Sequence, residues 1–73
     1  MGQALEDLRR KYESLWEIRE TRDFLTARRR AGLTWAQMGA GLLATVVAPT
    51  PEELGESLGR QDRIAEGFER GVL

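Results

Sequence analysis

Apolar residues recur at helical spacing through the first part of the chain. From Gln3 to about Ala31 there is no glycine or proline, and most residues are strong helix formers. The apolar positions are Leu5, Leu8, Tyr12, Leu15, Ile18 and Leu25. This pattern predicts one amphipathic helix over residues 1–31, about 40 Å long at a rise of 1.5 Å per residue. Trp16 and Phe24 flank the stripe and are expected in the core, because large aromatic side chains mainly supply buried area.

The apolar stripe of this helix needs a packing partner. One interpretation is a coiled coil with a second copy of the chain, in which the stripe forms the dimer interface. The other is packing on the chain's own C-terminal helices, and the pattern leaves both open because it runs for only about two heptads before Arg22. The residues predicted at the dimer interface are Leu5, Leu8, Tyr12 and Leu15.

The middle of the chain is its most apolar part. Residues 34–47 place Trp35, Met38, Leu42 and Leu43 at helical spacing, which predicts the central core helix. The segment APTP at 48–51 then predicts a short turn. Two further helices are expected at 51–58 and 61–70, around a turn at Gly59. The sequence thus predicts an all-α fold in a single domain over 1–73: a long N-terminal helix, then three shorter helices in a helix-turn-helix-like region over 32–73.

A short motif occurs twice in this region. Residues 34–42 (TWAQMGAGL) and 50–58 (TPEELGESL) share Thr, then Met or Leu and Gly, then Leu at the same offsets. In each copy the Thr is followed three residues later by Gln37 or Glu53, the pattern of a capping box at a helix start. Each copy also has a central glycine, which costs about 1 kcal/mol in a helix. A repeated glycine therefore predicts close approach of a second helix.

The second copy continues into TPEELGESLGRQDRIAEGFERG, residues 50–71. This stretch resembles the phage-repressor and Cro-like helix-turn-helix family, of the xenobiotic-response-element type. The matching features are Glu52-Glu53-Leu54, the Leu58-Gly59 turn and the ending Phe68-Glu69-Arg70-Gly71. A weaker match covers residues 25–42. The resemblance implies a helix-turn-helix fold, double-stranded DNA as partner and transcription regulation.

Composition narrows the function classes. The chain has 73 residues, no Cys, no His and a net charge of −1. These absences exclude disulfides, thiol or histidine catalysis and the common zinc sites, so no enzyme, metal or cofactor is expected. No apolar run approaches the roughly 20 residues of a membrane span, and MGQALEDLRR is too charged for a signal peptide. The expectation is a cytoplasmic protein with no membrane association.

Charge is distributed unevenly and suggests a DNA-binding surface. Residues 9–30 hold eight Lys or Arg against four acids, whereas residues 49–73 hold three Arg against six acids. Arginines near one point suit phosphate contacts, although Arg28-Arg29-Arg30 would equally complement the dipole at a helix C-terminus. Arg and Gln at the start of the last helix suit guanine and adenine edges. The predicted DNA-binding residues are Arg28, Arg29, Arg30, Arg60, Gln61 and Arg63, in a homodimeric transcription regulator.

A second hypothesis belongs to a different class. The last helix carries Asp62, Glu66 and Glu69 among its arginines, and an acidic helix suits a phosphate-lined groove poorly. The chain would then be a helical interaction module, an adaptor or inhibitor that holds another protein without binding DNA. Its acidic C-terminal helices would contact a basic surface of that partner.

Overall fold

The computed structural model describes residues 2–71 and combines helices with a sheet. In chain order the elements are α1 (Gly2–Tyr12), β1 (Trp16–Glu20), β2 (Leu25–Arg29), α2 (Trp35–Gly39), β3 (Thr45–Ala48) and α3 (Pro51–Glu69). The strands form one antiparallel sheet in the order β1-β2-β3. The prediction of an all-α, helix-turn-helix-like bundle is therefore wrong.

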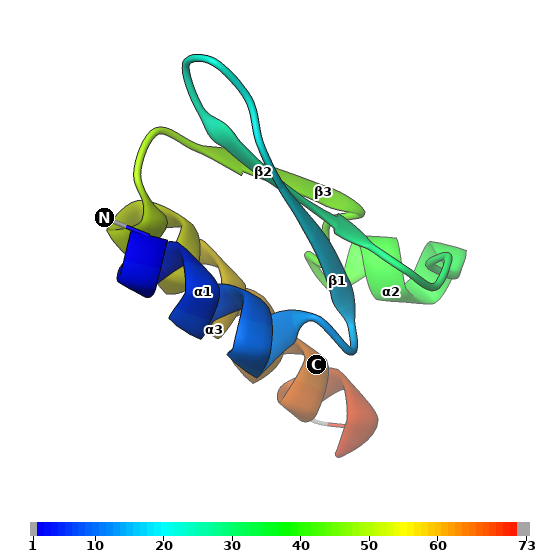
Figure 1. Cartoon of the computed structure of the whole chain (residues 1–73). Helices are drawn as coiled ribbons and strands as arrows, with labels where there is room; N and C mark the ends of the chain where they lie inside the picture. The colour runs from blue at the N-terminus through cyan, green and yellow to red at the C-terminus, as the bar shows by residue number, and fades with distance from the viewer. Residues whose placement is uncertain (1, 72–73) are drawn as a thin grey trace.

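Two helices cover one face of the sheet. α1 and α3 lie side by side beneath the strands, while α2 stands at one end of the sheet (Figure 1). α1 and α3 run parallel, because Leu8 meets α3 at Gly55 and Tyr12 approaches it one turn later at Gly59. The core between these layers consists of Leu5, Tyr12, Trp16, Ile18, Leu25, Ala27, Val46, Ala48, Leu54 and Leu58.

The long N-terminal helix was predicted wrongly, because it ends at Tyr12 and a β-hairpin follows. Along β1 and β2 burial alternates: Trp16 and Ile18 point inward with Leu25 and Ala27, and the intervening residues point outward. This is the two-residue period of a strand. The apolar spacing 15, 18, 25 fits a helical stripe only, whereas the buried pairs 16/18 and 25/27 have the spacing of a strand. Burial of these pairs against the two helices decides for the strand.

The predicted core helix over 34–47 is also wrong. Only Trp35–Gly39 is helical, and Gly41 has a φ of 102°, which a glycine adopts without strain and which ends the helical path. Thr45–Ala48 instead forms β3, with Val46 and Ala48 buried. The β-branched run Thr45, Val46 and Val47 favours a strand once it pairs with β2.

The turn predicted at Leu58-Gly59 is absent, because α3 runs unbroken from Pro51 to Glu69. Leu54, Leu58 and Gln61 are buried on one side of it, so the apolar contact continues past Gly59. A single glycine weakens a helix by about 1 kcal/mol without ending it. The two halves of the proposed helix-turn-helix motif are therefore one helix.

The helix starts predicted at Thr34 and Thr50 are confirmed, whereas the start predicted at 61 lies inside α3. The Thr34 hydroxyl accepts from the Gln37 N–H at 3.1 Å and the Gln37 side chain accepts from the Thr34 N–H at 2.8 Å, which is a complete capping box. The Thr50 hydroxyl accepts from the Glu53 N–H at 3.2 Å, ahead of Pro51. Close helix approach is confirmed for the second glycine only: a Cβ on Gly55 would lie 3.2 Å from Leu8 Cδ2, whereas nothing lies within 4 Å of one on Gly39.

Candidate protein interface

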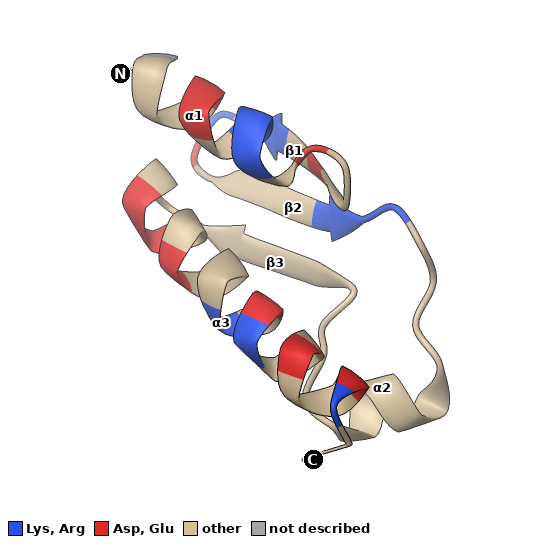
Figure 2. Ribbon diagram, turned by 90° about the horizontal axis from the view of Figure 1, so that it is seen from below, with Lys and Arg blue, Asp and Glu red and all other residues tan. Residues whose placement is uncertain are grey.

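The six residues predicted to bind DNA have different surroundings. Arg29 is half-buried on the inner side of β2, and Gln61 on α3 is buried at 5% exposure. The other four are exposed, two at the end of β2 and two along α3: Arg28, Arg30, Arg60 and Arg63. They are spread over the end of β2 and the middle of α3 (Figure 2). The turn that was to separate a recognition helix is missing, so no short helix starts at Arg60.

Two of the exposed arginines have partners within the protein. Arg30 Nε donates to the Glu13 carbonyl at 2.6 Å, which ties the end of β2 to the turn after α1. Arg60 Nη2 donates to Ser57 Oγ at 3.3 Å, one turn earlier on α3. These bonds orient both side chains and leave their charge at the surface.

Arg29 and Gln61 form a polar network that holds the chain before β3 against α3. Gln61 Oε1 accepts from the Leu43 N–H at 2.8 Å and from Arg29 Nη2 at 3.0 Å, and Gln61 Nε2 donates to the Gly41 carbonyl at 3.3 Å. Arg29 Nε donates to the Leu43 carbonyl at 2.8 Å. The network satisfies the backbone of the loop where it enters the sheet, so these two residues have a structural role in this fold.

The Arg29 guanidinium also stacks on the buried Trp16 ring, with 4.3 Å between its central carbon and the ring centroid. This distance is within the range of a cation–π contact. Burial lowers the pKa of Arg29 from its ordinary value, and the nearby Asp62 carboxylate opposes that change. The charge of Arg29 is thus used to fix the end of the sheet.

The residues predicted to form a dimer seam lie mostly within the monomer. Leu5 and Tyr12 are buried in the core, and Leu8 packs against it. Leu15 follows α1, in the turn before β1, and is 59% exposed. The apolar stripe of α1 therefore packs on the protein's own sheet and on α3, which was the alternative the pattern left open.

The most exposed aromatic residue of the described chain lies on α2. Trp35 is 87% exposed, and Met38, one turn later, is 43% exposed. Residues at positions i and i+3 lie on the same side of a helix. We call this pair the α2 apolar surface.

Several contacts hold α2 in place although it buries none of its residues. The capping box fixes its start, and the Leu42 N–H donates to the Gln37 carbonyl at 3.2 Å after its end. Leu42 itself is buried at 4% exposure. The Gln61 bond to Gly41 anchors the same turn on α3. The α2 apolar surface is therefore displayed on a fixed support rather than on a free loop.

A groove runs along the outer edge of β3, between that strand and α3. We call it the β3 groove; the residues that line it are Leu43, Thr45, Val46, Val47, Ser57, Arg60, Gln61 and Ile64. Leu43 and Val47 are both more than half exposed there. The lining includes one cation and no acid. Two apolar side chains at a sheet edge thus border a channel open to solvent.

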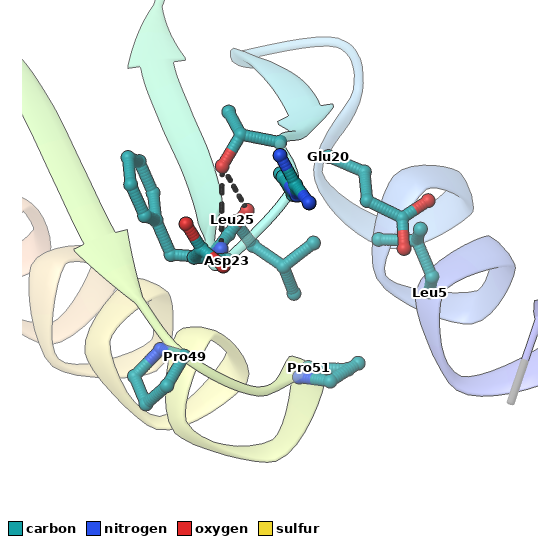
Figure 3. Close-up of a pocket in the computed structure, with 9 residues that line it drawn as sticks. Leu5, Glu20, Asp23, Leu25, Pro49 and Pro51 are labelled. Carbon is teal, nitrogen blue, oxygen red and sulfur yellow. Dashed lines mark hydrogen bonds between the residues drawn. The ribbon is translucent and has the colours of Figure 1, made fainter.

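A second hollow lies where the β1–β2 turn faces the starts of α1 and α3. Leu5, Leu25, Pro49 and Pro51 surround it, with Glu20 and Asp23 at the turn (Figure 3). Thr21 closes the turn, because its hydroxyl donates to the Phe24 carbonyl at 2.7 Å and accepts from the Phe24 N–H at 3.2 Å. Phe24, expected in the core, is 41% exposed at this rim. The hollow mixes apolar walls with charges of both signs and indicates no particular ligand.

Sequence reasoning missed the α2 apolar surface for a definite reason. Trp35 and Met38 were assigned to a core helix because they share helical spacing with Leu42 and Leu43. The glycines at 39 and 41 were the available signal, because glycines at a helix end commonly mark its termination. The predicted helix over 34–47 would have aligned all four apolar side chains on one face that packs in the core. The observed helix has five residues, which is too short for such a face, and none of them is buried.

Among residues 2–71, no helix combines the length and the apolar composition that crossing a membrane requires. Comparison of the chain with protein-family models, with curated proteins and with solved structures finds no match.

Proposed function

We propose that this protein is an interaction module that holds another protein through the α2 apolar surface. The observation that carries the proposal is the exposure of Trp35, at 87% of its surface. A tryptophan buries on the order of 200 Å² when it is covered. Leaving that area in water has no benefit for the monomer, whereas a partner gains from covering it.

Tryptophan is among the residue types that dominate binding energy at protein interfaces. Such an anchor works best when its position is fixed before binding, because less conformational entropy is then lost. The capping box of α2 and the bond from Gln61 to Gly41 provide this fixation. The partner is accordingly a protein with an apolar pocket that accepts an indole ring, and Met38 adds an adaptable contact beside it.

The charge of α3 suits the same role. Its first two turns contain Glu52, Glu53 and Glu56 without a cation (Figure 2). This acidic flank favours association with a basic partner surface, in keeping with an adaptor or inhibitor. Salt would weaken this contribution and leave the tryptophan contact largely unchanged.

DNA binding is the competing proposal. Its support is the four arginines that remain at the surface, Arg28, Arg30, Arg60 and Arg63. Contacts of this kind bind the phosphate backbone without reading sequence, and their affinity falls steeply as salt rises. The two proposals therefore differ in ligand and in salt dependence.

The experiment uses three baits: the wild-type chain, Trp35→Ala and Leu15→Ala. Leu15 is also exposed and apolar but belongs to the turn before β1 and not to α2, so its replacement is the matched control. A protein from the source cell that binds wild type and Leu15→Ala, and is lost from Trp35→Ala, is then purified. On titration with it the Trp35 fluorescence shifts to the blue, because Trp16 is already buried and contributes no change.

A mixed-sequence DNA duplex is tested in parallel by sedimentation at low salt. Binding that weakens with salt and is abolished by Arg28→Ala with Arg60→Ala would favour the DNA proposal instead. Equal capture by wild type and Trp35→Ala would refute the interaction site proposed on α2.

A further inference from the structure

The pairing of β3 with β2 shows which backbone groups of β3 have no hydrogen-bond partner on β2. The Arg29 N–H donates to the Ala44 carbonyl at 2.8 Å, and the register pairs Ala27 with Val46 and Leu25 with Ala48. In an antiparallel ladder alternate residues bond to the same neighbour. Ala44, Val46 and Ala48 therefore bond toward β2, and the N–H and C=O groups of Thr45 and Val47 point away from it.

The free edge is limited at both ends. Leu43 has the same orientation as Thr45, but its N–H donates to Gln61 and its carbonyl accepts from Arg29. At the other end Pro49 has no N–H to donate. Thr45 and Val47 are thus the two residues of β3 with outward backbone groups still to be paired.

One symmetric pairing satisfies all of these groups at once. If a second β3 runs antiparallel alongside the first, with Val46 facing Val46 of the other copy, Thr45 faces Val47 and Val47 faces Thr45. Both outward residues then form hydrogen-bonded pairs, each with two N–H···O bonds. Shifting the register by two residues in either direction brings Leu43 or Pro49 into the pairing and loses bonds.

The side chains around the edge fit the same arrangement. On the open face of the sheet, Thr45 and Val47 form β-branched cross-strand pairs, which are favourable neighbours. β3 is uncharged, and Val47 is 58% exposed. Natural sheets avoid presenting such an edge unless it is covered.

The charges of α3 favour a second copy of this chain as the partner that covers the β3 edge. A two-fold axis that is normal to the sheet and passes between the two Val46 residues sets the two copies of α3 antiparallel on the same face. Glu53, Ser57, Arg60 and Ile64 follow helical spacing along the side of α3 that faces the β3 groove. Arg60 of each copy is then brought toward the acidic first turns of the other α3, which contain no cation.

We infer that β3 is a dimerisation edge, which joins two copies of this chain into one six-stranded antiparallel sheet. The interface is independent of the α2 apolar surface. It differs from the coiled-coil seam predicted from the sequence, of which Leu5, Leu8 and Tyr12 pack within the monomer. The dimer displays two copies of Trp35, so a partner with two pockets binds it with increased avidity.

The test measures mass and amide protection for wild type, Val47→Lys and Thr26→Lys. Thr26 faces Val47 on the same side of the sheet but lies on the central strand, so its replacement adds the same charge away from the edge. Wild type and Thr26→Lys are expected to sediment at twice the 8.2 kDa chain mass, and Val47→Lys at the chain mass with an at least tenfold weaker association. Far-UV circular dichroism verifies that each variant is folded.

Amide exchange gives a second readout. The N–H groups of Thr45 and Val47 are expected to be protected in wild type and to exchange at least tenfold faster in Val47→Lys. The Leu43 N–H, bonded to Gln61, stays protected in both and serves as an internal reference. A wild-type protein that remains monomeric at millimolar concentration would overturn the inference, and so would a dimer that persists in Val47→Lys. Protection of the Thr45 and Val47 amides only on addition of a different protein would assign the edge to that partner instead.

Discussion

The two edges of this three-stranded sheet are built differently. β1 carries Glu17, Arg19 and Glu20 in five residues, and Arg19 pairs with Glu17 at 3.4 Å. β3 has no charge in four residues and places an exposed valine on its outer face. Charged side chains on an edge strand oppose pairing with other chains, whereas uncharged β-branched residues favour it. One sheet thus has a protected edge and an edge available for pairing.

The comparison also shows how the length of an edge is set. The Arg30 N–H donates to the Leu15 carbonyl, so on β1 the outward backbone groups belong to Trp16, Ile18 and Glu20. On β3 the outward groups of Leu43 are taken by Gln61 and Arg29. Side chains from α3 and β2 therefore shorten one edge, and the charges of β1 protect the other.

The largest expected effect comes from removing Gln61. In Gln61→Leu the Leu43 N–H and the Gly41 carbonyl lose their hydrogen-bond partners. Arg29 loses one of its two acceptors and keeps the Leu43 carbonyl. The three hydrogen bonds are partly buried, and each contributes about 1 kcal/mol, so we expect a loss of roughly 3 kcal/mol in the free energy of unfolding. The lost bond also frees the Leu43 N–H and lengthens the edge of β3. Urea denaturation measures the change.

Gln61→Glu is the matched control for this variant. It keeps an acceptor for Leu43 and gives Arg29 a charged partner, but it loses the 3.3 Å donation to Gly41 and sets a carboxylate oxygen against that carbonyl. Most of the stability should remain. If Gln61→Leu and Gln61→Glu unfold at the same urea concentration, the network does not stabilise the loop as described.

Two parts of the fold differ in how well the sequence predicts them. The helix starts at Thr34 and Thr50 were predicted correctly, because a cap depends on residues within one turn. The hairpin was missed because Leu15, Ile18 and Leu25 have helical spacing. The strand period appears only in the two short pairs 16/18 and 25/27. Local spacing does not contain the information that α1 and α3 cover one face of that segment, and this coverage selects the strand.

The candidate site shows the same division. The arginines and Gln61 were identified as notable residues, but which of them point inward depends on strand register and on α3 running through Gly59. Trp35 was placed in the core because its neighbours are apolar. Its exposure follows from the shortness of α2, which the glycines at 39 and 41 signalled only in part.

A smaller loss is expected from Arg29→Lys. Lysine keeps the charge but lacks the planar fork that donates to Leu43 and Gln61 while it stacks on Trp16. We expect a decrease of about 1–2 kcal/mol in the free energy of unfolding. In thermal denaturation this lowers the melting temperature by roughly 5–10 °C for a chain of this size.

Arg28→Lys, at the neighbouring position but on the outer face of the sheet, should leave the melting temperature unchanged and is the control. Equal melting temperatures for Arg29→Lys and the wild type would contradict the role given to the planar guanidinium group and its two donated hydrogen bonds.

The difference between the edges is tested directly by Glu17→Val with Arg19→Val. These side chains lie on the open face of the sheet, so the free energy of unfolding should change by less than about 1 kcal/mol. The variant then has uncharged β-branched residues at both edges. We expect association beyond the dimer, measured by light scattering across a concentration series.

Arg28→Val, on the central strand, is the control that adds one apolar residue to the same face and leaves both edges unchanged. A double variant with the same association state as wild type would show that the charges of Glu17 and Arg19 do not protect β1.

The smallest change in stability is expected at the most exposed residue. Trp35 touches little of the protein, so Trp35→Ala should alter the free energy of unfolding by less than about 0.5 kcal/mol. The variant should keep the wild-type association state, because the α2 apolar surface and the β3 edge are separate. Its fluorescence should come from the buried Trp16 alone and show a blue-shifted maximum.

A loss of dimer in Trp35→Ala would mean that the tryptophan belongs to the contact between copies. A decrease of several kcal/mol in the free energy of unfolding would mean that it is part of the core. The expected combination of unchanged fold, unchanged association and lost partner binding is specific to a residue whose contacts are made with another protein.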